Sequence, residues 1–138
     1  MTTKVLVVED NRDSAAILRS ILENNGCHVD VAEDGAEALE RLAAALPDVM
    51  LLDIMMPGLS GLDVLDSIRR DHRTSRLPVI LVTAKTLDDD VMGGYQCGAD
   101  YYITKPFTAK QLLYGLRLVL GESRLPARPR GKENEDLA

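Results

Sequence analysis

Five side chains suited to chemistry stand at the ends of short apolar runs in this sequence. They are the carboxylates of Glu9, Asp10 and Asp53, the hydroxyl of Thr83 and the ammonium group of Lys105. Three carboxylates brought together repel one another, and without a cation their pKa values would rise. Oxygen ligands of this kind suit Mg²⁺, which binds through a few carboxylates together with water and phosphate oxygens. If the fold gathers these residues, they could bind Mg²⁺ and receive an anionic phosphoryl group.

Three of these residues could each have a different role in phosphoryl transfer. The Asp53 carboxylate can act as the nucleophile toward phosphorus, as carboxylates do in proteins that form an aspartyl phosphate. Lys105 would supply a positive charge for one phosphoryl oxygen, and Thr83 could donate a hydrogen bond to another. Taken singly, each residue has an ordinary alternative, because an acidic pair can end a strand or cap a helix and a lone Asp can form a turn. Their occurrence together at one edge of a fold favours the chemical interpretation.

The elements that must position these residues are visible as an alternation of patterns. Five apolar runs alternate with segments of 3.6-residue periodicity, and the runs lie at 5–8, 29–32, 49–52, 79–82 and 101–103. Continuous Val, Leu, Met and Ile are typical of strands covered on both faces. The alternation predicts an α/β, doubly wound fold: a five-stranded parallel sheet with five helices on its two faces. Ligands of such a sheet bind beyond the carboxyl ends of the strands.

Helix ends agree with this alternation. Four pairs of residues have the spacing of N-terminal caps, namely Asp34 and Glu37, Ser60 and Asp63, Thr86 and Asp89, and Thr108 and Gln111. Gly26 is expected to end the first helix. The four pairs are consistent as a set, since each stands where a periodic segment begins.

Length and charge restrict the class of protein. The chain has 138 residues, which fits one domain at 1–121 followed by a charged, Pro-containing tail at 122–138. We expect the tail to be flexible, although it could equally be a linker to an output domain. The net charge of −6 disfavours nucleic-acid binding by the domain itself.

Targeting signals and cysteines point to one compartment. No apolar run approaches the roughly 18 residues of a membrane span or the roughly 7–15 of a signal peptide. Cys27 and Cys97 lie outside any C-x-x-C spacing and are interpreted as reduced thiols. We therefore expect a cytoplasmic protein.

Four segments together resemble the receiver domain of bacterial two-component response regulators. The segments are 5–10 (VLVVED), 51–58 (LLDIMMPG), 82–84 (VTA) and 98–107 (GADYYITKPF). The similarity covers about residues 4–120, with the expected order and spacing. It implies a flavodoxin-like sheet with strand order 2-1-3-4-5. It also implies a signalling domain that catalyses its own phosphotransfer and dephosphorylation, and not a metabolic enzyme.

The resemblance assigns the acceptor and the metal ligands. Asp53 would accept the phosphoryl group. Glu9 and Asp10, with Asp53 and the main-chain carbonyl of Met55, would hold Mg²⁺. The phosphodonor would be a histidine kinase or a histidine phosphotransfer protein.

The resemblance also assigns the switch residues. Thr83 would be the hydroxyl that turns toward the phosphoryl group, and Tyr102 the aromatic side chain that moves inward after it. Lys105 would pair with the phosphoryl group, and its peptide bond to Pro106 would be cis. The face of the fourth helix, fifth strand and fifth helix would then contact a partner, so a phosphorylation-dependent homodimer is a hypothesis.

Three other functional classes have features in common with this sequence. A Mg²⁺-dependent phosphatase with an aspartyl phosphate typically has a second Asp two residues after its nucleophile, where this chain has Met55. A flavodoxin-like electron carrier needs a Ser-, Thr- and Gly-rich loop after the first strand, whereas residues 9–13 (EDNRD) would repel a flavin phosphate. A receiver that belongs to a longer regulator with a DNA-binding or enzymatic output remains open.

Overall fold

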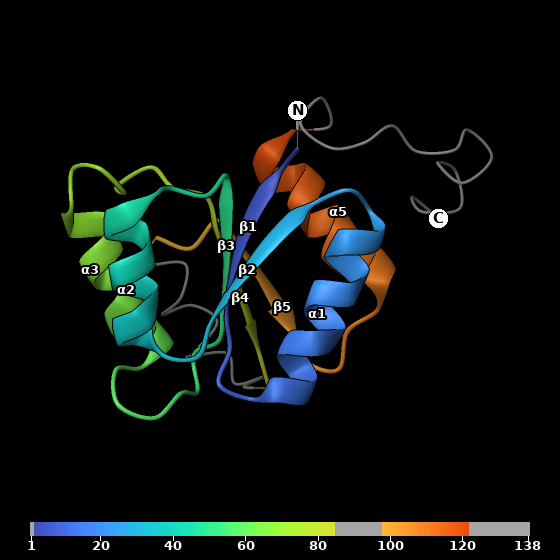
Figure 1. Cartoon of the computed structure of the whole chain (residues 1–138), viewed down its shortest axis with the longest axis horizontal. Helices are drawn as coiled ribbons and strands as arrows, with labels where there is room; N and C mark the ends of the chain where they lie inside the picture. The colour runs from blue at the N-terminus through green and yellow to red at the C-terminus, as the bar shows by residue number, and fades with distance from the viewer. Residues whose placement is uncertain (1, 85–97, 122–138) are drawn as a thin grey trace.

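A parallel five-stranded sheet runs through the centre of the molecule (Figure 1). The structure, a computed structural model, describes residues 2–84 and 98–121. The strands are β1 (Lys4–Val8), β2 (His28–Ala32), β3 (Val49–Leu52), β4 (Val79–Thr83) and β5 (Tyr101–Thr104). Their order is β2-β1-β3-β4-β5, and every neighbouring pair is parallel. The predicted fold class, strand positions and strand order are confirmed.

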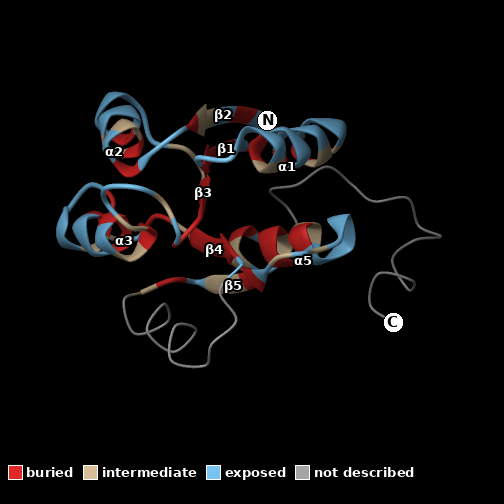
Figure 2. Cartoon of the chain, turned by 90° about the horizontal axis from the view of Figure 1, so that it is seen from below, coloured by how far each residue is buried: buried red, intermediate tan, exposed pale blue. Residues whose placement is uncertain are grey.

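Helices cover both faces of the sheet. Four are described: α1 (Arg12–Asn24), α2 (Gly35–Ala44), α3 (Gly61–Arg70) and α5 (Ala109–Leu120). Figure 2 shows α2 and α3 on one side of the sheet and α1 and α5 on the other. The predicted fourth helix, with its Thr86 cap, and the predicted flexible tail at 122–138 lie outside the described residues. None of the helices within 2–84 and 98–121 is long and apolar enough to span a bilayer.

Side-chain caps begin the described helices as the spacing predicts. Ser60 and Thr108 form capping boxes with Asp63 and Gln111. At the start of α2, the Asp34 side chain accepts a hydrogen bond from the backbone N–H three residues on, at 2.8 Å. Each cap satisfies an N–H group that would otherwise lack an intrahelical partner, and is worth about 1 kcal/mol.

Gly26 ends α1 in the manner expected of a C-terminal glycine. Its φ is 83°, a left-handed conformation that few other residues adopt readily. The N–H of Gly26 donates to the carbonyl of Glu23 at 3.1 Å, and that of Cys27 donates to Leu22 at 3.0 Å. The chain thereby reverses and enters β2.

The core has two layers, one on each face of the sheet. Alternate strand residues point to opposite faces, so Leu6 and Val8 pack toward α2 and α3 while Val5 and Val7 pack toward α1 and α5. All residues of β3 and β4 are buried. Because both faces are covered, a one-residue slip would place each side chain on the wrong face, and the register is fixed. The carboxyl ends of the strands therefore meet at one edge.

Candidate functional site

Parallel pairing brings the predicted site residues to the carboxyl edge of the sheet. Glu9 follows β1 and Asp53 follows β3, and the register pairs the strand residues just before them. The Asp53 N–H extends this ladder by donating to the Val8 carbonyl at 3.1 Å. On the other side, the Lys105 N–H donates to the Thr83 carbonyl at 2.8 Å. Residues up to 96 positions apart are thus neighbours.

Three carboxylates form a cluster at this edge. One oxygen from each of Glu9, Asp10 and Asp53 lies within 4.8 Å of the others. Glu9 is only 3% exposed and Asp53 only 6%, whereas Asp10 faces solvent. Buried carboxylates need a compensating cation, and an all-oxygen set with one open side fits a hard divalent ion. The cluster could therefore bind a metal.

Lys105 supplies the cation within the protein itself. Its ammonium group forms an ion pair with Glu9 and a second one with Asp53 Oδ2, at 3.3 Å. The peptide bond from Lys105 to Pro106 is cis, the isomer that the resemblance implies. The lysine side chain is 20% exposed, so this charge acts where water screens it only in part.

Burial and pairing shift two pKa values in the site. Burial raises the pKa of Glu9, the neighbouring charge of Asp53 raises it further, and the hydrogen bonds from Lys105 and from the N–H of Asn11 only partly oppose this. Burial lowers the pKa of Lys105, but its bonds to Glu9 and Asp53 and their negative charges outweigh that effect, and the pKa is raised overall. Lys105 therefore stays charged at neutral pH.

The turn after β3 fixes the Asp53 carboxylate. Its Oδ1 accepts a hydrogen bond from the Met55 N–H at 3.0 Å, and the Gly61 N–H donates to the Ile54 carbonyl at 2.9 Å. A Cβ at Gly61 would lie 2.2 Å from the Asp53 carbonyl oxygen, so the start of α3 approaches this turn as only glycine can. Sequence reasoning missed Gly61; its place directly after the capping residue was the available signal.

Asn11, and not the acidic pair, caps α1. Its Oδ1 accepts a hydrogen bond from the Ser14 N–H at 2.9 Å, while its own N–H donates to Glu9 Oε2 at 3.2 Å. The alternative use of Glu9 or Asp10 as the cap of this helix is therefore wrong. Both carboxylates remain available to the site.

The remaining predicted residues differ in how deeply they are buried. Thr83 is fully buried at the end of β4. Tyr102 is half-buried and packs against the core layer that faces α2 and α3. Met55 is 54% exposed, and it contacts Asp53 through its backbone N–H.

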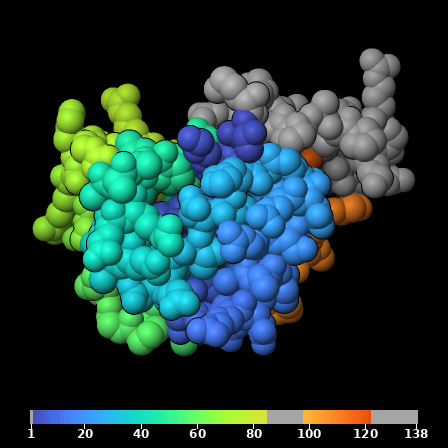
Figure 3. All heavy atoms as spheres, in the orientation of Figure 1, coloured from blue at the N-terminus to red at the C-terminus, as the bar shows by residue number. Residues whose placement is uncertain are grey.

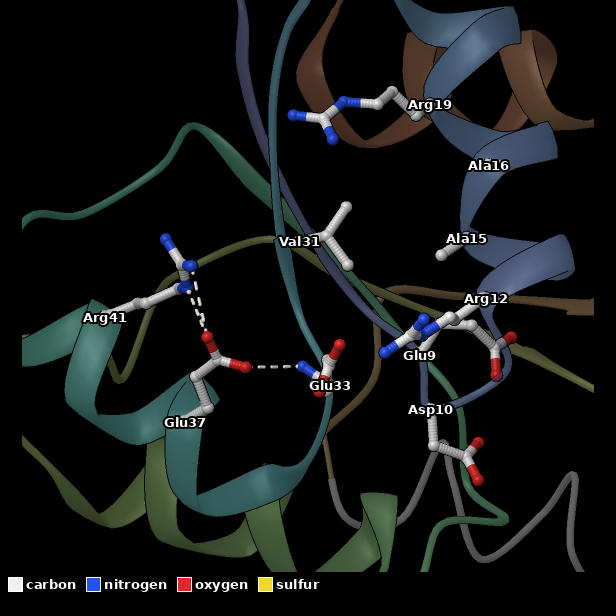
Figure 4. A pocket seen from close by; sticks show the side chains of 10 residues that line it. All are labelled: Glu9, Asp10, Arg12, Ala15, Ala16, Arg19, Val31, Glu33, Glu37 and Arg41. Atoms are coloured by element: carbon white, nitrogen blue, oxygen red, sulfur yellow. Dashed lines mark hydrogen bonds and ion pairs between the residues drawn. The ribbon is translucent and has the colours of Figure 1, made fainter.

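A pocket of about 560 Å³ lies beside the acidic pair, between α1 and α2. Figure 4 shows Arg12 and Arg19 entering it from α1 and Arg41 from α2, with Val31 of β2 between them. Glu37 pairs with Arg41 at 3.1 Å, so part of this charge is neutralised internally. The space-filling view shows the face of the molecule that α1, β2 and α2 form at the β2 edge of the sheet (Figure 3). We assign the pocket no separate ligand.

Comparison with known proteins identifies the family. Residues 5–117 match the response regulator receiver domain. The chain is 37% identical over 131 residues to the transcriptional regulatory protein CpxR of Escherichia coli (strain K12), covering 95% of this chain and 55% of that protein. It is 43% identical over 122 residues to the transcriptional regulatory protein DltR of Streptococcus agalactiae serotype III (strain NEM316), covering 88% and 54%. The chain thus spans about half the length of these curated relatives.

Solved structures agree with the fold. The chemotaxis protein CheY4 of Vibrio cholerae superimposes with a TM-score of 0.82 at 30% identity, covering 87% of this chain and all (100%) of that one. A response regulator from Chloroflexus aurantiacus gives a TM-score of 0.85 at 30% identity, with coverages of 88% and 100%. The family match, the strand order and the carboxylates at the carboxyl edge of the sheet agree with one another. The chain belongs to the response regulator receiver domain family of bacterial two-component systems.

Proposed function

We propose that this receiver accepts a phosphoryl group on Asp53 with Mg²⁺ bound beside it. The observation that carries the proposal is the cluster of three carboxylate oxygens within 4.8 Å, two of the carboxylates being paired with Lys105. Glu9, Asp10 and Asp53 would hold the ion together with the main-chain carbonyl of Met55. When bound, Mg²⁺ would neutralise charge on the transferring group.

The transfer itself would use this chain's own side chains. An Asp53 carboxylate oxygen attacks phosphorus, a new O–P bond forms, and the P–N bond to the donor histidine breaks as the imidazole leaves. Lys105 would then shift from Glu9 toward a phosphoryl oxygen, and Thr83 would donate a hydrogen bond to another. Tyr102 would follow Thr83 inward. Water would later hydrolyse the acyl phosphate, so each cycle consumes one phosphodonor and regenerates the Asp53 carboxylate.

Intact-mass analysis with acetyl phosphate tests this proposal. We expect a gain of one phosphoryl group that requires Mg²⁺ and is lost in Asp53→Asn. Asp66→Asn is the matched control, because Asp66 lies on the exposed side of α3, where it pairs with Arg70. A gain that persists in Asp53→Asn would place the acceptor elsewhere. No gain with acetyl phosphate or with a phosphohistidine donor would refute phosphoryl transfer.

The proposed phosphodonor is a histidine kinase or histidine phosphotransfer protein. A net charge of −6 favours a protein partner over nucleic acid for this domain. CpxR and DltR are described as transcriptional regulatory proteins, and this chain spans about half of each. The boundary at 121, the following segment at 122–138 and the cytoplasmic location stay predictions.

A phosphorylation-dependent homodimer is a second proposal, supported by α5. Tyr114 and Leu118, one helical turn apart, are 41% and 54% exposed. We expect a phosphoryl mimic such as beryllium trifluoride to increase the sedimentation coefficient, and Leu118→Asp to prevent this. Ile17→Asp is the control, because Ile17 of α1 is similarly exposed at 57%. Equal sedimentation with and without the mimic would contradict dimerisation.

A further inference from the structure

β5 has less support from the sheet than its neighbour β4. Among the strands that the structure describes, it lies at the edge of the sheet and pairs only with β4. Of its four residues only Ile103 is buried, whereas every residue of β4 is. Yet β5 leads directly to Lys105 and must hold that residue beside the three carboxylates at the carboxyl edge of the sheet. Contacts at the two ends of β5 add to the support that it receives from β4 and α5.

Arg69 of α3 supplies such contacts at the start of β5. Its Nε and Nη2 donate to the Gly98 carbonyl at 2.9 and 2.7 Å, and its Nη1 donates to the Leu77 carbonyl at 2.6 Å. Nη2 also pairs with Asp100 Oδ2 at 3.1 Å. The same oxygen accepts a hydrogen bond from the Val79 N–H, at 2.8 Å. We call this set of contacts the Arg69 clamp.

The geometry of the Arg69 clamp suits arginine and glycine specifically. A guanidinium group is a planar fork with five donors, which a lysine ammonium group cannot reproduce. Gly98 has a φ of 100°, and a Cβ there would lie 3.0 Å from Arg69 Nε. The Arg69 side chain is only 18% exposed, so solvent screens its bonds to the two backbone carbonyls little, whereas the Asp100 side chain is 45% exposed and that ion pair is screened more. The clamp joins α3, the entry to β4 and the entry to β5.

Lys105 holds the opposite end of β5. Its N–H donates to the Thr83 carbonyl at 2.8 Å, and its ammonium group pairs with Glu9 and Asp53. The strand is therefore held by one charged contact set before its first residue and another after its last.

We propose that these two ends support β5 redundantly, and that the Arg69 clamp keeps β5 paired with β4 when Lys105 leaves Glu9. This rests on the proposed function in one respect, namely that a phosphoryl group on Asp53 is what draws Lys105 away. The redundancy itself belongs to the unphosphorylated fold. It predicts that weakening either end alone has a small effect, and that weakening both has an effect larger than the product of the two.

Amide hydrogen exchange of the peptide that covers 101–105 tests this directly, in metal-free, unphosphorylated protein. The variants are Asp100→Asn, Lys105→Met and their combination, with Asp66→Asn as the matched control. Asp66 lies three residues before Arg69 on α3, but it pairs with Arg70 at 3.1 Å, and both of these side chains are exposed. We expect each single variant to speed exchange by less than about threefold and the double variant by more than about tenfold.

The outcomes separate the alternatives. A double effect equal to the product of the single effects would show two independent contacts and overturn the redundancy. The role of the clamp would be overturned if exchange in Asp100→Asn is no faster than in Asp66→Asn and the double variant exchanges no faster than Lys105→Met alone. If the double variant does not fold, Lys105→Gln, which removes the charge but keeps a polar side chain at the carboxyl edge, replaces Lys105→Met and the same comparison decides.

A second arm connects the inference to phosphorylation. A phosphoryl mimic should speed exchange of 101–105 more in Asp100→Asn than in the unmodified chain. Suppose that the metal-free arm shows redundancy but the mimic changes exchange in none of the variants. That result would count against phosphorylation of Asp53 and not against the clamp. Equal acceleration in both proteins would overturn the clamp's part in the response.

Discussion

At the scale of residues, the site has more negative charge than the protein can neutralise alone. Glu9, Asp10 and Asp53 carry three negative charges, and the single ammonium group of Lys105 faces two of them. Asp10 remains at the solvent side of the cluster. Removing its charge should relieve repulsion without breaking the ion pairs of Lys105.

Asp10→Asn is therefore expected to stabilise the metal-free protein. In the presence of a chelator, we expect the free energy of unfolding to rise by up to about 1 kcal/mol, because two like charges about 4 Å apart repel at about this strength when they are surrounded by water, and Asp10 is exposed. Added Mg²⁺ should then stabilise the variant less than it stabilises the unmodified chain. Urea denaturation with and without Mg²⁺ measures both effects.

Asp13→Asn is the matched control, with the opposite expected sign. Asp13 lies in the first turn of α1, where a negative charge is favourable, so its loss should destabilise by about 0.3–1 kcal/mol. If Asp10→Asn destabilises the metal-free protein as Asp13→Asn does, the repulsion argument is wrong.

At the scale of elements, the start of α3 is fitted to the turn that carries Asp53. The capping box of Ser60 begins the helix, and Gly61 lets its backbone approach the Asp53 carbonyl. No side chain could occupy that space without displacing backbone, and the displaced backbone would be that of the proposed acceptor. Helix packing and site geometry are therefore coupled here.

Gly61→Ala should reveal this coupling. The added methyl group would lie 2.2 Å from the Asp53 carbonyl oxygen, so we expect destabilisation by roughly 1–3 kcal/mol together with weaker Mg²⁺ binding. Gly58→Ala is the control: its φ of 76° costs about 1–2 kcal/mol in backbone conformation, but no atom lies within 4 Å of the new Cβ. Denaturation and Mg²⁺ titration are the measurements. Equal Mg²⁺ affinity in both variants would refute the coupling.

At the scale of the whole molecule, the two-layer core controls access to Cys27. This thiol is 7% exposed in the layer that faces α1 and α5. Burial raises its pKa, because the thiolate would be poorly solvated. The folded protein therefore holds this proton more tightly than the unfolded chain does. The resulting stability is complete below the unfolded pKa and is lost as pH rises through the folded pKa.

Thiol labelling should follow opening of the fold. In a Cys97→Ser background, we expect Cys27 to react with a thiol reagent at least tenfold more slowly than in the denatured chain, since the reactive thiolate is both rare and covered. Urea below the transition should speed the reaction. Native labelling as fast as in denaturant would show that the layer around Cys27 opens freely.

Much of this architecture could be predicted from the sequence alone. Short apolar runs predicted the five strands to within one residue at either end, because burial on both faces leaves a local pattern. The caps at Ser60 and Thr108 could be predicted because their partners lie only three residues away in the sequence. The site residues at the carboxyl edge were identifiable because each one ends a strand or lies within two residues after it.

Tertiary structure decided which of those residues contact one another. The ion pairs of Lys105 with Glu9 and Asp53 join positions 96 and 52 residues apart, and the clamp from Arg69 to Asp100 joins positions 31 apart. Neither leaves a periodic or short-range signal. The close approach of Gly61 to the Asp53 turn depends likewise on how α3 packs. Local patterns determine elements, whereas contacts between distant residues follow from sheet register and helix packing, which are settled only when the chain is folded.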